Sequence, residues 1–234
     1  MITFRIRIVI FLLLISLSAS SQTIEDLTFG TDHTLEVATW NIENFPKYGQ
    51  NTIDYVSQII RKLDIDIIAF QEITDTVLFK QMLNNLPDYQ YYCKSLWYGG
   101  LAFIYKTEVI QINNFYEIFT TSPYWSPFPR SPLVLDMNYM DQNIFVINNH
   151  LKCCGDGILD LNNSEDEETR RFIAMNLLKE YIDSNLQDKK VLVVGDFNDD
   201  IADSESDNVF INIINDNQNY LFADMDIAQG NSSQ

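Results

Sequence analysis

The sequence predicts an α+β fold in which two packed β-sheets are flanked by helices. A strand and a helix come early, several strand-like runs follow one another in the middle, and a helix and a strand come late. A purely parallel sheet would instead alternate strands and helices throughout. The chain has 234 residues, of which 46% are hydrophobic, so it can form one domain with its own core.

The amino-terminal part of the sequence contains the apolar patterns of both a helix and a buried strand. Ile53, Val56, Ile60 and Leu63 recur at helical spacing, whereas the apolar run that ends at Phe70 is typical of a buried strand. A second helix should stop before Pro87, because the residue before a proline disfavours helical geometry. We expect strands at 35–40 and 65–70, a turn-prone segment at 41–50, and helices at about 51–63 and 76–86.

The middle and the end of the chain continue the pattern. Ser164 and Glu167 have the spacing of a capping box, and an apolar helical face follows them at Phe172, Met175, Leu178 and Ile182. That helix leads to the β-branched run 191–194, which we expect to be a strand. The middle strands are expected at 89–93, 101–105, 109–119, 133–139 and 144–149.

Residues 1–21 are typical of a secretory signal peptide. Arg5 and Arg7 precede the apolar run 8–17, and small residues follow at 18–20. The apolar run is shorter than the ~20 residues that span a bilayer, which favours cleavage over a membrane anchor. We therefore expect an exported protein, secreted or periplasmic, whose domain comprises residues 22–234 and has no stable membrane span.

The charge of the chain restricts its partners. Cleavage would remove Arg5 and Arg7 and take the net charge from −18 to −20. Such a surface repels phosphate backbones and argues against a protein that coats nucleic acid, although bound metal ions could supply positive charge locally. Three cysteines are too few for a disulfide scaffold. One bridge, from Cys93 to Cys153 or Cys154, and three reduced thiols both remain open.

The segment "VLVVGDFNDDIADSESD", residues 191–207, partly matches an EF-hand calcium loop. Asp196, Asn198 and Asp200 occupy its first, third and fifth positions. Ile201 replaces the glycine of the sharp turn, Asp207 replaces the bidentate glutamate, and a strand-like run replaces the incoming helix. The segment is better interpreted as a strand that ends in polar groups.

Four predicted strands end in such groups. The strand ends carry Asn41 with Glu43, Glu72, His150, and Asp196 with Asn198. Singly, each could be a cap or a solvated turn, and His150 could be a core residue. Together, at one edge of a sandwich, they would form a site of oxygen ligands and a histidine, which suits Mg²⁺, and alternatively Mn²⁺ or Ca²⁺, better than structural zinc.

The motifs "TWNIEN", "FQE", "GGLAFIYK", "RSPL", "NNHLK" and "GDFND", within residues 35–200, carry a family resemblance. The sequence resembles the endonuclease/exonuclease/phosphatase superfamily, which includes pancreatic-type deoxyribonucleases, sphingomyelinases and inositol-phosphate phosphatases. The resemblance implies a four-layer αββα sandwich with the site at one edge. It also implies that Glu72 is the main metal carboxylate and that Asn41 and Glu43 hold the metal and its water.

The same resemblance implies roles at the phosphate. His150 would contact the scissile phosphate and assist the leaving group, and Asp196 would orient or deprotonate the attacking water. Asn198 would bind a phosphate oxygen, and Arg130, in "RSPL", would lie near the substrate. A surface arginine without such a role remains the alternative for Arg130.

The resemblance breaks at the carboxyl end. The family pattern ends in a strand with an Asp-His pair, whereas no histidine follows His150 here, and His33 comes too early. Asp224 and Asp226 are acids in this region, with nothing else to tie them to the role. We expect a domain that lacks its last strand or strands, with a degenerate family member as the alternative.

The expected function is that of an exported metal-dependent phosphodiesterase, a nuclease with nucleic acid as its substrate and a monomer in solution. A phospholipase C-type (sphingomyelinase-like) enzyme, a phosphatase and a non-catalytic truncated member remain alternatives. DNA, RNA, lipid and small phosphate esters are all open as substrates.

Overall fold

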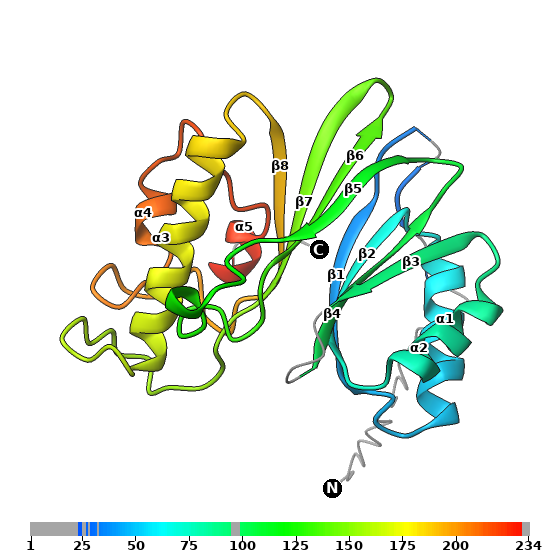
Figure 1. The fold of residues 1–234 in the computed structure, drawn as a ribbon, viewed down its shortest axis with the longest axis horizontal. Coiled ribbons are helices and arrows are strands. Elements are labelled where there is room, and N and C mark those ends of the chain that lie inside the picture. Colours follow the sequence, from blue (N-terminus) through cyan, green and yellow to red (C-terminus); the bar gives the residue numbers. More distant parts are fainter. Residues whose placement is uncertain (1–22, 25–26, 28, 32, 95–98, 231–234) are drawn as a thin grey trace, which may run out of the picture.

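A computed structural model of the chain describes residues 23–24, 27, 29–31, 33–94 and 99–230 (Figure 1). The predicted signal peptide, residues 1–21, lies outside the described residues. Among the described helices, none is long and apolar enough to cross a membrane.

The described strands form two four-stranded sheets. Each sheet is mixed, because β1–β2 and β7–β8 are parallel pairs and the other neighbours are antiparallel. The first sheet has the order β1 (Val37–Phe45), β2 (Ile67–Ile73), β4 (Gly100–Lys106) and β3 (Tyr89–Lys94). The second has the order β5 (Gln111–Glu117), β6 (Leu133–Tyr139), β7 (Gln142–His150) and β8 (Lys190–Asp196).

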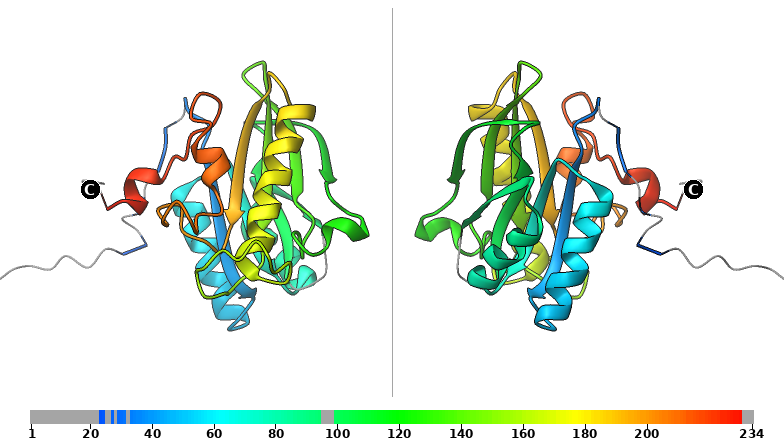
Figure 2. Two further views of the ribbon diagram at one scale, coloured as in Figure 1. Left: turned by 90° about the vertical axis from the view of Figure 1, so that its left-hand side faces the viewer. Right: turned by 90° about the vertical axis from the view of Figure 1, so that its right-hand side faces the viewer.

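The helices lie on the outer faces of the two sheets (Figures 1 and 2). α1 (Gln50–Leu63) and α2 (Thr76–Met82) pack on the first sheet, and α3 (Glu167–Asn185) and α4 (Ile211–Ile214) pack on the second. A last short helix, α5 (Met225–Ala228), follows. The predicted α+β class is confirmed, as is the four-layer αββα arrangement that the resemblance implied.

Alternation along the strands divides the core into three layers. In β2, Ile67 and Ala69 pack between the two sheets, whereas Ile68 and Phe70 pack against the helices of the first sheet. The second sheet does the same, since Val146 faces inward and Ile147 faces the α3 side. Successive side chains of a strand point to opposite faces of the sheet, so every second residue reaches the space between the two sheets.

Parallel pairing puts the functional strand ends at one edge of the sandwich. β1 and β2 end side by side, as do β7 and β8, and His150 pairs with Asp196 in register. β1 and β8 also contact each other across the sandwich. The carboxyl ends of four strands from two sheets consequently meet.

Several expected boundaries need correction. β1 extends into the predicted turn as far as Phe45, with a register shift against β2 after Asn41. The predicted second helix ends at Met82 and tightens into a 3₁₀ turn, and β5 is shorter than expected. The predicted capping box is wrong, because Asp166 caps α3 by accepting from the Thr169 amide.

The three cysteines are free thiols. Cys93 is half-buried on β3, whereas Cys153 and Cys154 are exposed after β7. None of the bridges that the sequence left open is present among these residues, and the redox state of the three thiols stays a prediction.

Candidate active site

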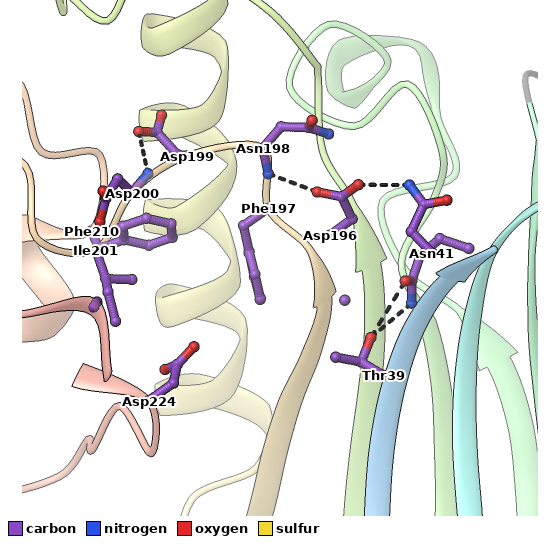
Figure 3. A pocket seen from close by; sticks show the side chains of 13 residues that line it. Thr39, Asn41, Asp196, Phe197, Asn198, Asp199, Asp200, Ile201, Phe210 and Asp224 are labelled. Carbon is purple, nitrogen blue, oxygen red and sulfur yellow. Dashed lines mark hydrogen bonds between the residues drawn. The ribbon is translucent and has the colours of Figure 1, made fainter. Parts of the chain in front are cut away.

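One side-chain amide joins the two sheets at the shared edge. The Asn41 Nδ2 atom, at the end of β1, donates to Asp196 Oδ2 on β8 at 2.7 Å and to Glu72 Oε1 on β2 at 3.0 Å. Figure 3 shows Asn41 and Asp196 pointing toward each other between the two strands. Two carboxylates from different sheets therefore converge on a single amide.

The side chain of Glu72 reaches this point only because the end of β2 is irregular. Strict alternation would place Glu72 on the same face as Phe70, against the helices. The register with β4 shifts between Phe70 and Ile73, and Glu72 has a φ of 65°. A β-carbon on Gly99 would lie 2.9 Å from the Glu72 Cα atom, so this close approach requires a glycine.

The backbone also holds the Glu72 carboxylate. The Asn44 amide donates to Glu72 Oε2 at 2.9 Å, while Oε1 accepts from Asn41. The Glu72 side chain keeps 21% of its surface exposed, so the carboxylate remains accessible.

His150 lies between the two carboxylates and is almost fully buried. Its Nε2 atom is 3.7 Å from Asp196 Oδ2 and 4.0 Å from Glu72 Oε1. Burial, helped by the charge of Arg130, lowers the pKa of His150 to about 4, although both carboxylates act in the opposite direction. His150 is thus neutral at pH 7, and its position close to Asp196 matches the expected cluster.

Asn198 and Arg130 meet next to His150 at the carbonyl of Leu151. The Asn198 Nδ2 atom donates to this oxygen at 3.2 Å, and Arg130 Nη1 donates to it at 3.5 Å. The Asn198 backbone amide donates to Asp196 Oδ1 at 3.0 Å and orients that carboxylate. Arg130 is half-buried rather than a free surface arginine, and burial lowers its pKa.

Glu43 is the one predicted site residue that lies apart. Its carboxylate pairs with Lys47, and 65% of its side chain is exposed. Its backbone amide donates to Asn41 Oδ1, so it supports Asn41 through the main chain. Its role as a metal ligand stays a prediction.

Sequence reasoning missed a buried polar pair behind the site. Asn148 Oδ1 accepts from Gln71 Nε2 at 2.8 Å, across the space between the sheets. Asn148 Nδ2 donates to the Phe70 and Ala102 carbonyls at 3.0 and 3.1 Å. The available signal was an inward-facing polar residue shortly before each of Glu72 and His150.

A glycine brings β8 close enough to β7 for this arrangement. A β-carbon on Gly195 would lie 2.1 Å from the Asn149 carbonyl oxygen, and Gly195 has a φ of 142°. Gly195 directly precedes Asp196, so the position of this carboxylate depends on the absence of a side chain one residue earlier.

A cavity of about 550 Å³ opens beside Asn41 and Asp196. Asp199, Asp200 and Asp224 also line it (Figure 3). Asp224, an acid that the sequence could not tie to a role, therefore lies on the cavity that the site opens into.

The donor set fits a hard divalent cation. Glu72 and Asp196 bring two negative charges together, and the neutral His150 does not balance them. Carboxylate and amide oxygens are the ligands that Mg²⁺, Mn²⁺ and Ca²⁺ prefer.

The family follows from a match over most of the chain. The family model described as Endonuclease/Exonuclease/phosphatase family matches residues 38–219, which include every predicted site residue. This chain belongs to the endonuclease/exonuclease/phosphatase family. Its members hydrolyse phosphoester bonds. No curated protein sequence matches the chain significantly.

Solved structures share the fold at low sequence identity. The human Nocturnin catalytic domain with bound sulfate has a TM-score of 0.62 and 16% identity, with 86% of this chain and 77% of that chain covered. Danio rerio TDP2 with a single-strand DNA product has a TM-score of 0.57 and 15% identity, with 74% and 62% covered. A Bacteroides thetaiotaomicron mannosyl-6-phosphatase has a TM-score of 0.55 and 19% identity, with 76% and 70% covered.

These likenesses show the fold alone. The chain spans less than two thirds of the TDP2 structures that it matches, between 47% and 66% of their lengths.

Proposed function

We propose that this chain is a metal-dependent phosphodiester hydrolase that acts as a nuclease after export from the cytoplasm. The observation that carries the proposal is the convergence of Asn41, Glu72, His150 and Asp196, from two sheets, at one accessible edge. Family membership supports hydrolysis of a phosphoester bond. The fold shared with a TDP2 structure that holds a single-strand DNA product supports a nucleic acid as the substrate.

Glu72 and Asn41 are the residues that would hold the metal ion. Glu72 offers an accessible carboxylate. Asn41 would offer its amide oxygen, which here accepts from the Glu43 amide while the Nδ2 atom faces Glu72 and Asp196. A bound divalent ion supplies positive charge to the phosphate oxygens and lowers the pKa of a nearby water. Mg²⁺ is the first choice, with Mn²⁺ and Ca²⁺ as alternatives.

The residues of the chain itself would position the phosphate and the water. Asp196, held by Asn41 and by the Asn198 amide, presents a carboxylate that can orient a water for attack. Neutral His150, with its Nε2 atom toward the site, can donate to a phosphate oxygen. Arg130 and Asn198 extend the donor surface next to His150.

A small phosphate ester or a phospholipid headgroup is the second candidate substrate. The net charge of −18 disfavours long-range attraction of a polynucleotide. The fold is also shared with a mannosyl-6-phosphatase. Both substrates would use the same metal and the same phosphate donors.

The test compares substrates under defined metal conditions. The purified chain is incubated with plasmid DNA, with sphingomyelin vesicles and with mannose 6-phosphate, each in Mg²⁺, Mn²⁺, Ca²⁺ or a chelator. We expect DNA cleavage in Mg²⁺ and none with the chelator. His150→Ala and Glu72→Gln should each reduce the rate by about 10²–10⁴-fold, whereas the exposed control Glu108→Gln should not.

The outcomes separate the hypotheses. Turnover of mannose 6-phosphate or sphingomyelin without DNA cleavage would contradict the nuclease proposal and favour a small phosphate ester or a phospholipid headgroup as the substrate. No turnover of any substrate would favour a non-catalytic member that only binds a ligand. Export is tested separately, by locating the protein in cell fractions and sequencing its mature amino terminus.

A further inference from the structure

A second group of carboxylates, none of which belongs to the predicted active site, lies at the amino-terminal end of α3. Asp156, Asp166 and Glu168 each offer one carboxylate oxygen, and these oxygens lie within 4.8 Å of one another. Asp156 belongs to the loop between β7 and α3, Asp166 caps the helix, and Glu168 is in its first turn. Two separate segments therefore contribute to the cluster.

One member of the cluster is a buried carboxylate with an unsatisfied oxygen. Only 2% of the Glu168 side chain is exposed. Its Oε1 atom accepts from the Gly157 amide at 2.7 Å and lies 3.1 Å from Arg171 Nη2. Its Oε2 atom is buried without a hydrogen-bond partner among the described residues. Arg171 and Gly157 both act on Oε1, so a bound cation would be the partner that the buried Oε2 atom lacks.

The charged side chains around Glu168 also carry an excess of negative charge. Arg171 pairs with Glu168 and, at 2.6 Å, with Asp199, and all three side chains are at least 95% buried. One guanidinium therefore faces two carboxylates before Asp156 and Asp166 are counted. The excess negative charge suits a divalent cation.

We propose that Asp156, Asp166 and Glu168 bind a structural divalent cation, with Ca²⁺ preferred. The ligands are all oxygens and come partly from a loop, which suits the long and adaptable Ca–O distances. Three oxygens that all lie within 4.8 Å of one another are close enough to bind a single cation.

The bound ion would hold the loop that follows His150. Arg171 Nη1 donates to the Lys152 and Cys154 carbonyls at 2.8 and 2.7 Å. Arg171 also pairs with Glu168 and Asp199, so an ion bound to Glu168 would stabilise the end of α3 to which the loop is attached. We expect the effect of the ion to be on the stability of the folded chain, and its ligands differ from Glu72 and Asn41 of the active site.

The test measures Ca²⁺ binding in a chain whose active-site metal ligand is removed. All variants carry Glu72→Gln. Asp156→Asn with Asp166→Asn removes two charges but keeps the side-chain oxygens that accept from Ile158 and Thr169. Asp160→Asn is the matched control, because this exposed acid lies in the same loop and also accepts a backbone hydrogen bond.

Equilibrium dialysis with radioactive Ca²⁺ and thermal unfolding give two readouts that need no activity. We expect the Glu72→Gln chain to bind Ca²⁺ with a Kd at or below about 1 mM, and to unfold at a higher temperature in its presence. The double asparagine variant should bind at least about tenfold more weakly, and Asp160→Asn should bind as its parent does. Equal binding by parent and double variant, or no binding by the parent up to about 10 mM, a concentration above the range of weak protein calcium sites, would overturn the proposal.

Discussion

Replacement of Asn148 by alanine tests whether the pair behind the site sets the spacing of the two sheets. Asn148 is fully buried and makes three hydrogen bonds, to Gln71, Phe70 and Ala102. A hydrogen bond contributes roughly 0.5–1.5 kcal/mol net, and removal of one partner leaves the others buried and unsatisfied. We therefore expect Asn148→Ala to lower the free energy of unfolding by about 2–4 kcal/mol.

The activity should fall as well, for a geometric reason. Gln71 precedes Glu72 directly, and Asn148 lies two residues before His150. If the sheets shift at this point, the distance between the carboxylate and the imidazole changes. Phosphoester hydrolysis, measured below the unfolding temperature of the variant, should decrease by about tenfold or more, since a displacement of about 1 Å at a site can cost about 10²-fold.

A matched asparagine on the same strand provides the control. Asn143, at the opposite end of β7, donates to Asp136 at 2.7 Å and to the Met137 carbonyl at 3.1 Å, but it is only partly buried. We expect Asn143→Ala to cost less than about 1 kcal/mol in urea unfolding. If both variants lost the same stability, the cross-sheet pair would have no special role and the reasoning would be refuted.

Three further predictions concern single residues. Gly195→Ala should cost at least about 2 kcal/mol in urea unfolding, because its β-carbon would overlap the Asn149 carbonyl; unchanged stability would contradict the close approach. Without metal, His150 should not reduce the free energy of unfolding above pH 6.5. This free energy should fall as the pH decreases from 6.5 toward 4, because the pKa of His150 is about 4 in the folded chain and the unfolded chain takes up the proton first. His150→Gln should flatten this part of the pH profile, and an unchanged profile would exclude His150 as its cause. Burial raises the pKa of Cys93 to about 11 from 9.0, so with the other two cysteines replaced by serine, iodoacetamide should modify it about a hundredfold more slowly at pH 8 than a cysteine in an unfolded peptide. Equal rates would show an exposed thiol.

Much of the site could be predicted because it depends on strand ends. An apolar run followed by a polar residue marks the end of a buried strand, and alternation then fixes the direction of that residue. Asn41, His150 and Asp196 follow this rule, since each continues the inward-facing row of its strand. The expected strand at 133–139 agrees with β6 for the same reason, a clear change from apolar to turn residues.

The remainder depends on contacts that no local pattern encodes. Glu72 violates alternation, and only the register shift beside Gly99 turns it toward Asn41. The resemblance implied a metal-side role for Glu43, but its carboxylate pairs with Lys47 and is largely exposed to solvent. The capping box failed because Asp166, closer to the helix, offered an equally good acceptor.

Assembly of the site requires both sheets at once. The second sheet by itself places Asp196 next to His150. Only the first sheet adds Glu72, the second carboxylate, together with Asn41, which contacts both carboxylates. The repulsion between Glu72 and Asp196 acts at the same edge where Asn41, and behind it the Gln71–Asn148 pair, hold the sheets together. A divalent ion at this edge would relieve that repulsion, and metal binding should therefore stabilise the folded chain as well as support hydrolysis. Conversely, substitutions that loosen the contact between the sheets should weaken metal binding even when they lie outside the coordination shell.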